Sequence, residues 1–476
     1  MNKRVLFWLL VFFVLLDLIY SYAQNYQLPL DGDMAEIILP APSCLKVMQD
    51  PFGWASLMRD EVYVAPNRFF AHASMMLYFK SVPFWLQKLT DPVNSLYVAC
   101  ALFKTVVQGL LLYLLGVYIS NTYSLRRLEL WVAVALLVPL FQTSGFNVQM
   151  GVIDHSTTYT FFYAFSMTLL LVLLLPFYQA AYRQQPLRLH WLQQAALVGL
   201  MVVLAFNAPI VIGTTGVLII GIGGHLLIKY WSTGSEATKL QVKQLRPVLL
   251  LLGVFAVLCV YSLYIGRNDA ENLTHTLPVL ERYKVLPYGL FRQLAVKPGL
   301  PLLLLLIGVN VYLIQRKAPA TPESRRLVRI ARWVGLFAVV YIVLLPLGGY
   351  RNYRPLILRR DSFLPVTLGL FYFYGLSSYY LLQQLPARPR RFYLAGLLLF
   401  CALFLGVDRL KIKADNNACE RQALERLAGA SEPIVRLDAG CNVMSWQPIT
   451  QPVFSEVNAQ LLEYWGVTQG KKLYYQ

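Results

Sequence analysis

Charge is scarce in this chain. Only 14% of its 476 residues are Asp, Glu, Lys or Arg, whereas 57% are hydrophobic, and the mean hydropathy is +0.52. Long apolar runs recur along the whole length, and this composition excludes a soluble protein. No internal repeat stands out, which argues against a solenoid or a propeller. We therefore expect an integral membrane protein.

Cysteine and histidine are also few, with six and five residues. No Cys/His spacing resembles a zinc site. Cys100, Cys259 and Cys401 fall within apolar runs, where small apolar packing is expected. Cys419 and Cys441 flank a short segment near the C-terminus and could form a disulfide in an oxidising compartment. We expect no cofactor; a divalent metal, if one binds, would have Asp31 and Asp33 as ligands.

About eleven apolar runs are long enough to cross a bilayer. They are 5–23, 95–119, 128–144, 158–180, 191–207, 209–230, 247–266, 299–315, 330–348, 363–383 and 392–408. We interpret the break at 206–209 as a tight turn between two spans. The sequence thus predicts an all-α polytopic membrane protein with a transmembrane domain at 1–408 and a small α/β tail at 409–476.

The net charge of +18 follows the membrane topology. With a cytoplasmic N-terminus, Arg and Lys collect in every cytoplasmic loop, which is the positive-inside pattern. These residues are Arg126, Arg127, Arg183, Arg188, Lys229, Lys239, Lys243, Arg246, Arg316, Lys317, Arg325, Arg326, Arg329, Arg332, Arg388, Arg390 and Arg391. The basicity therefore does not indicate a nucleic-acid partner. It places the remaining loops and the tail outside the cytoplasm, and we expect a bacterial inner membrane with a periplasmic C-terminus.

The first run could instead be a signal peptide, since Ser21-Tyr22-Ala23 has the small residues of a cleavage site. Asp17 and the length of the run favour an uncleaved span. Either interpretation leaves the residues that follow on the extracytoplasmic side.

Three carboxylates, Asp31, Asp33 and Glu36, stand within six residues just after the first span. Asp-Gly is turn chemistry, so a solvated turn is one interpretation of the stretch 28–36. A general base, a metal ligand or a cation site is the other. The stretch opens a long loop at 24–94 that is too apolar for a free linker. We expect short interfacial helices there, with Arg68 and His72 as candidate binding residues.

Two other loops on the same side carry polar candidates. Asp154 and His155 lie in the loop at 145–157. Either Asp154 or Ser156 caps a helix there, or the loop contributes polar groups to a cavity. Arg282 and Lys284 lie in the loop at 267–298, which we expect to form another interfacial helix.

The loop at 349–362 violates the positive-inside rule, because it places four arginines outside the cytoplasm. They are Arg351, Arg354, Arg359 and Arg360, interleaved with Tyr350 and Tyr353. A guanidinium group is well suited to phosphate. General binding of lipid headgroups is one interpretation, and we favour a specific phosphate site.

An acidic cluster and an arginine cluster on one face of a membrane protein suit a reaction on a phosphorylated lipid. The arginines would hold the phosphate as it leaves, and a carboxylate would deprotonate an acceptor hydroxyl. If the leaving group is a polyprenyl phosphate, the unit attached to it is most simply a sugar.

In layout the chain resembles the GT-C class of membrane glycosyltransferases, which use lipid-linked sugar donors. The resemblance rests on one span followed by Pro29-Leu30-Asp31-Gly32-Asp33, a long outer loop with interfacial helices, Asn67-Arg68-Phe69-Phe70 before an apolar helix, and many further spans. It covers residues 1–408 and leaves the tail unmatched. It implies Asp31 or Asp33 as catalytic base. Gly32 stands where the family often has an acidic residue, so the choice between the two stays open.

The resemblance also implies that basic residues of later outer loops contact the donor phosphate, which is consistent with the four arginines of 349–362. The expected partners are a polyprenyl-phosphate-linked sugar, membrane lipids, and a glycan, lipid or protein acceptor. Two other classes stay open. A flippase or transporter should carry ionisable groups within its spans, and here Lys104 and Gln108 are among the few polar residues there. An envelope-assembly protein would use the tail as its binding module.

Overall fold

The computed structural model describes the chain except residues 1, 234, 275, 410–415 and 439, and except the side chains of 229–230, 232–244, 273–274 and 409. The predicted loop residues Lys229, Lys239 and Lys243 therefore lie outside the described side chains. The predicted boundary of the tail at residue 409 adjoins residues that are not described.

Eight helices in the described part of the chain are long and apolar enough to cross a membrane. They are α1 (Lys3–Tyr26), α7 (Pro92–Ser120), the run of α10 (Thr157–Tyr159), η2 (Thr160–Phe165) and α11 (Ser166–Arg183), α13 (Pro209–Thr233), α14 (Ser235–Gly266), α17 (Gly299–Arg316), α18 (Pro322–Leu344) with η4 (Leu345–Gly348), and α20 (Ala387–Arg409). These helices confirm the predicted all-α membrane class.

Three other predicted spans are helical but are not among the eight. Helix α8 (Leu128–Leu137), which continues into η1 (Val138–Leu140), and α12 (Trp191–Ala205) are shorter. Helix α19 (Arg360–Gln384) is long but rich in Tyr and Ser, and it packs against α7, α8, α17 and α18. Because α19 is enclosed by other helices, it needs less apolar surface than a lipid-facing span. Eleven spans therefore stays a prediction.

Short helices connect the long ones, as predicted for the loops at 24–94 and 267–298. They are α2 (Met34–Ile38), α3 (Pro42–Gln49), α4 (Trp54–Arg59), α5 (Phe69–Phe79), α6 (Val82–Leu86), α9 (Gly145–Val148), α15 (Ala270–Thr274), α16 (Val279–Phe291) and η3 (Arg292–Val296). The predicted break between two spans is also present, because α12 ends at Ala205 and α13 begins at Pro209.

Helix α7 is the central packing element. Asp91 caps its start by accepting a hydrogen bond from the Asn94 amide (2.8 Å), and Pro92 takes the first helical position, where no amide is needed. The helix packs against α1, α8, α11 and α19. Phe103 of α7 stacks on Phe161, with ring centroids 3.6 Å apart. This packing fixes the start of α10 and α11 beside α7.

The tail is a small α/β unit, as predicted. It consists of α21 (Ala418–Gly429), β1 (Ile434–Arg436), η5 (Pro452–Ser455), α22 (Glu456–Tyr464) and β2 (Leu473–Tyr475), and the two strands pair in parallel. Cys419 and Cys441 form a disulfide, which the sequence had left open.

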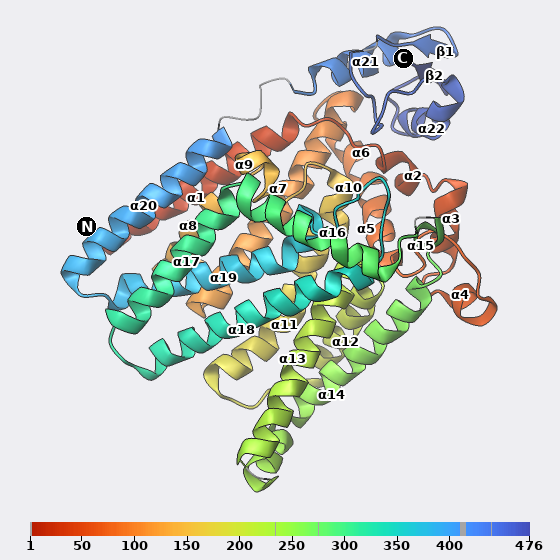
Figure 1. The fold of residues 1–476 in the computed structure, drawn as a ribbon. Helices are drawn as coiled ribbons and strands as arrows, with labels where there is room; N and C mark the ends of the chain where they lie inside the picture. Colours follow the sequence, from red (N-terminus) through yellow and green to blue (C-terminus); the bar gives the residue numbers. More distant parts are fainter. Residues whose placement is uncertain (1, 234, 275, 410–415, 439) are drawn as a thin grey trace.

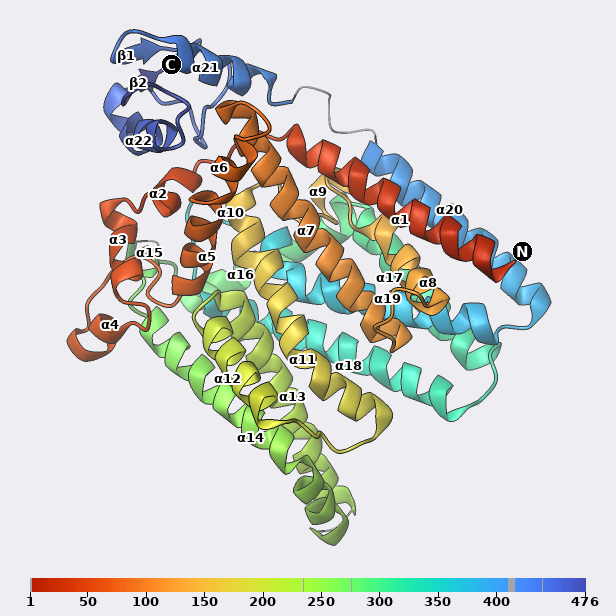
Figure 2. The same ribbon diagram turned by 180° about the vertical axis from the view of Figure 1, so that it is seen from behind.

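The tail is docked on the helical domain and covers its end beside α2 and α6, opposite the end where α13 and α14 project (Figures 1 and 2). Trp465 is fully buried at this junction. Its Nε1 donates to the carbonyl of Phe79 (3.0 Å), and its own carbonyl accepts from Gln87 (2.8 Å). The tail is therefore held against the segment that carries the carboxylates.

Candidate functional site

We call residues 28–36 the acidic loop. Asp31 is buried in it, and both carboxylate oxygens are engaged. Oδ2 accepts from the amide of Thr158 (3.0 Å), and Oδ1 accepts from the Thr158 hydroxyl (2.7 Å) and the Asp33 amide (3.2 Å). Buried carboxylates are stabilised by such donors. Asp31 thus fastens the acidic loop to the start of α10.

Asp33 has a different environment. Its Oδ1 accepts from the indole Nε1 of Trp446 in the tail (2.6 Å). Burial raises the pKa of Asp33, and the hydrogen bond from Trp446 and the charge of Arg354 partly oppose this shift. Glu36 lies on the exposed side of α2, and burial of its carboxyl followed by the charge of Asp33 raises its pKa. Asp33 thus lies within electrostatic reach of Arg354.

We call residues 349–362 the arginine loop. Its Arg354 guanidinium lies 4.3 Å from the ring centroid of Tyr159, and Nη1 is 3.4 Å from Oδ2 of Asp361. Burial lowers the pKa of Arg354, while the charges of Asp361 and Asp33 raise it. Tyr159 also stacks on Trp446, with centroids 5.9 Å apart and planes at 18°. Asp33, Tyr159, Arg354 and Trp446 form what we call the central cluster, where the acidic and arginine loops meet.

The other three arginines of the loop are bound to carboxylates. Arg359 makes a two-pronged contact with Asp361, at 3.0 Å through Nε and 3.1 Å through Nη2. Arg360 pairs with Asp154. Burial alone would raise the pKa of Asp361, but Arg359 and Arg354 hold it below its usual range. These pairs neutralise part of the positive charge that the sequence places at this end.

Arg351 and Arg68 meet at one buried carboxylate, Asp269. Arg351 lies 3.6 Å from Asp269 and 3.2 Å from Glu271, and Arg68 lies 3.2 Å from Asp269. The Nε of Arg68 is buried without a hydrogen-bond partner in the described part of the chain. His72 is buried behind Arg68, whose carbonyl contacts Nδ1 at 2.9 Å, and burial lowers the His72 pKa to about 4. His72 therefore supports α5 as a neutral side chain.

In the loop at 145–157 the helix cap is made by Ser156, and Asp154 and His155 support it. Asp154 accepts from the amide of Ser156 (2.9 Å), and the Ser156 hydroxyl caps α10 by accepting from the amide of Tyr159 (3.1 Å). Asp154 also holds Arg360. His155 is mostly buried, with Nε2 2.7 Å from the carbonyl of Thr143. Burial, followed by the charges of Arg360 and Lys104, lowers its pKa to about 4.

Lys104 closes this network from within α7. Its side chain is fully buried, and Nζ donates to the carbonyl of His155. The few polar groups of the spans thus include a cation directly beneath the loop at 145–157.

Four of the predicted binding residues are not members of the central cluster. Arg282 donates to the carbonyls of Leu277 (2.7 Å) and Pro346 (3.2 Å), and Lys284 pairs with Glu281 (2.6 Å) in an exposed position. Tyr353 donates to Glu271 (3.0 Å), and the carbonyl of Tyr350 accepts from Arg351 (2.9 Å). Arg282 and Lys284 thus stabilise α16 and its surroundings.

The tail supplies two residues that the sequence did not reveal, Trp446 and Glu420. Glu420 is buried and accepts from the amide of Leu30 (2.8 Å), the hydroxyl of Tyr97 (2.9 Å) and the amide of Met444 (2.9 Å). Burial raises its pKa to about 7 against the effect of these donors. Glu420 therefore joins the acidic loop, α7 and the segment before Trp446.

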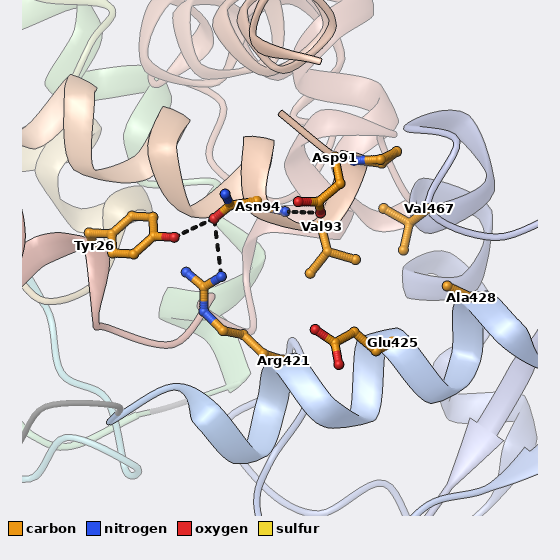
Figure 3. Close-up of a pocket in the computed structure, with 9 residues that line it drawn as sticks. Tyr26, Asp91, Val93, Asn94, Arg421, Glu425, Ala428 and Val467 are labelled. Carbon is orange, nitrogen blue, oxygen red and sulfur yellow. Dashed lines mark hydrogen bonds between the residues drawn. The ribbon is translucent and has the colours of Figure 1, made fainter. Parts of the chain in front are cut away.

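A separate pocket of about 460 Å³ lies between the tail and the start of α7 (Figure 3). Arg421 reaches into it, with its guanidinium 3.9 Å from the ring of Tyr97 and Nη1 donating to Asn94 (3.1 Å). Asp91 and Glu425 also line it, so its charge is mixed. The pocket lies on the α7 side of the tail and has none of the central-cluster residues in its lining.

Within the described residues, no group of three or more His, Cys, Asp or Glu side chains is placed to hold a metal ion. No protein-family model, no curated protein and no solved structure matches the chain.

Proposed function

We propose that this protein is a glycosyltransferase that moves a sugar from a polyprenyl-phosphate donor to an acceptor outside the cytoplasm. One observation carries the proposal. A half-buried carboxylate, Asp33, and a stacked guanidinium, Arg354, are connected through Trp446 and Tyr159 where two loops from distant parts of the sequence meet. A base and an anion-stabilising cation at one end of apolar helices are what transfer from a phosphorylated lipid requires.

Asp33 is the better candidate for the base. Both carboxylate oxygens of Asp31 accept hydrogen bonds from Thr158 and the Asp33 amide, whereas Asp33 accepts the hydrogen bond of Trp446 through Oδ1. The raised pKa of Asp33 makes it a stronger base than an ordinary aspartate. Asp31 then acts as a positioning residue that holds the loop.

The reaction follows from these positions. Asp33 accepts the proton of an acceptor hydroxyl, and the oxygen of that hydroxyl forms a bond to the anomeric carbon of the sugar. The bond from that carbon to the phosphate oxygen breaks, and polyprenyl phosphate leaves with the electron pair. Attack opposite to the leaving group inverts the anomeric configuration. Arg354 stabilises the charge that develops on the phosphate.

Arg354 is the most suitable of the four arginines for this task. Arg351, Arg359 and Arg360 are closely paired with carboxylates, and they shape the arginine loop. The ion pair of Arg354 is longer, with Nη1 3.4 Å from Oδ2 of Asp361. A phosphate dianion can compete with that contact, because a charge-assisted hydrogen bond at shorter distance is stronger.

The setting proposed for this reaction is the outer face of a bacterial inner membrane. The basic loops at the opposite end of the helices favour a cytoplasmic location for that end. The isoprenoid chain of the donor would stay in the bilayer beside the spanning helices, while its phosphate reaches the central cluster.

Binding of polyprenyl phosphate to the protein in nanodiscs tests the proposal. We expect wild type to bind it and Arg354→Ala to bind it about tenfold to a hundredfold more weakly. Arg426→Ala is the matched control, because Arg426 is exposed and pairs with Asp438 in the tail. Absence of binding to wild type, or equal loss in the Arg426→Ala control, would contradict the proposal.

A further inference from the structure

Trp446 combines an exposed aromatic surface with a fixed indole nitrogen. It remains 52% exposed, yet its indole nitrogen is committed to a carboxylate, Oδ1 of Asp33. One side of the ring stacks near Tyr159. An exposed aromatic surface therefore lies beside the candidate base, and the tail carries it there.

The backbone around Trp446 holds this position firmly. Gly32 makes the approach feasible, since a Cβ at that position would lie 2.7 Å from the amide nitrogen of Trp446 and 2.8 Å from its Cδ1. Asn442 donates to the carbonyl of Trp446 (3.0 Å). The amide of Met444, which has a left-handed φ of 46°, donates to Glu420 (2.9 Å). The Cys419–Cys441 disulfide ties the start of this segment to α21.

We propose that the exposed face of Trp446 is the platform on which a saccharide acceptor binds. This inference rests on the proposed function and specifies its acceptor class. A sugar ring has an apolar face of C–H groups and a polar edge of hydroxyls. An exposed indole complements the apolar face, and the adjacent carboxylate and tyrosine complement the hydroxyl edge. The central cluster offers this combination with Asp33 placed where an acceptor hydroxyl would give up its proton.

The location favours the acceptor over the donor. Arg354 and the apolar helices account for the phosphate and the isoprenoid of the donor, whereas Trp446 belongs to the tail that covers the end of the helices (Figure 2). A polar acceptor approaches from this aqueous side. Membrane anchoring does not explain the residue, because an anchoring tryptophan directs its N–H to lipid headgroups and this one directs it to Asp33.

Saturation-transfer NMR on the full chain tests the platform without knowledge of the natural acceptor. The probes are mannobiose, chitobiose, galactobiose and arabinobiose. We expect saturation of the ring C–H protons of at least one disaccharide with wild type. Trp446→Ala and Trp446→Leu should weaken that binding about fivefold to tenfold, because both remove the aromatic face. Trp446→Leu keeps apolar bulk in case the alanine variant does not fold.

Two variants serve as controls. Trp446→Phe keeps a ring and should keep the saturation. Phe454→Ala removes another exposed aromatic side chain of the tail (66% exposed) and should change nothing. The inference is overturned if no disaccharide contacts wild type, or if the signal is the same in Trp446→Leu.

The disaccharide experiment and the polyprenyl-phosphate experiment distinguish failure of the platform from failure of the proposed function. Loss of disaccharide binding in the Trp446 variants with intact polyprenyl-phosphate binding supports the platform. Disaccharide binding in a protein that binds no polyprenyl phosphate would sustain a saccharide site and refute the transferase. Polyprenyl-phosphate binding without any disaccharide contact would refute the platform alone.

Discussion

Arginine is used in opposite ways at the two ends of the helices. At the end that carries the acidic loop, Arg351, Arg359 and Arg360 pair with carboxylates. At the other end, Arg325, Arg326 and Arg329 line a pocket of about 610 Å³ between α11 and α18. In the described part of the chain these three make no ion pair, and Arg326 lies 3.9 Å from the ring of Tyr182 instead.

The difference separates two uses of one residue type. Unpaired arginines keep their full charge and suit the orientation of a helix in the membrane. Paired arginines contribute little net charge, so their value lies in the fixed geometry of the guanidinium group. Arg354 lies between these classes, with a carboxylate at 3.4 Å and an aromatic ring beneath it. The comparison can be tested by changing residues at each end.

The largest effect is expected at Asp33, the proposed base. Asp33→Asn removes the proton acceptor and should lower sugar transfer about a hundredfold or more, with donor binding retained. Transfer to a saccharide acceptor from radiolabelled polyprenyl-phosphate sugar measures this. Asp60→Asn, which breaks an exposed pair with Arg267 (2.7 Å), is the control. Full activity of Asp33→Asn would show that Asp33 is not the base and that the end with the acidic loop has no catalytic role through this residue.

Arginine substitutions test the comparison directly. Arg354→Ala should weaken polyprenyl-phosphate binding about tenfold to a hundredfold, whereas Arg329→Ala at the opposite end should leave it unchanged. Titration in nanodiscs by calorimetry gives both affinities. Equal losses in the two variants would mean that general attraction by positive charge explains binding.

Removal of the disulfide should affect one end only. Cys419→Ser/Cys441→Ser opens a loop with a sequence separation of 22 and should destabilise the tail by roughly 3 kcal/mol. Hydrogen exchange should then rise in residues 28–36, which contact the tail, and stay constant in residues 181–184. A uniform rise at both ends would show that the tail stabilises the whole domain.

Glu420 should make the docking of the tail depend on pH. Its pKa is raised from 4.5 to about 7 by burial, so the protonated form is favoured in the docked state. This contribution is complete below pH 4.5 and disappears as the pH rises through about 7. We expect opening of the tail to be at least about tenfold more frequent at pH 8 than at pH 5. Hydrogen exchange at both pH values measures it, and Glu420→Gln should remove the dependence.

The sequence predicted the parts of this molecule that local patterns determine. Apolar runs predicted the membrane class, and the aromatic residues of 24–94 predicted short helices. The positions of Cys419 and Cys441 allowed a disulfide without deciding it. The eleven spans were less secure, because α19 obtains its apolar surroundings from neighbouring helices and does not need a continuous apolar surface. Composition alone does not reveal such enclosure.

The site was predicted as two clusters but not as one network. Arg351 pairs with Asp269 and Glu271, which lie in a loop far away in the sequence. Asp33 is hydrogen-bonded to Trp446, which lies near the other end of the chain. Sequence periodicity does not predict contacts of this kind. Arg282 and Lys284 were the predicted binding residues of 267–298, whereas Asp269 and Glu271 are the residues of this loop that contact Arg351.

Lys104 couples the insertion of α7 to the packing of the loop at 145–157. A lysine near the middle of a spanning helix costs roughly 3 kcal/mol when that helix enters the membrane alone. In the finished protein its ammonium group is bonded to the carbonyl of His155, which is synthesised only after α8 has followed. The contact with His155 therefore offsets part of this cost only once the loop at 145–157 has packed against α7. Folding of the site thus contributes to the stable insertion of its central helix.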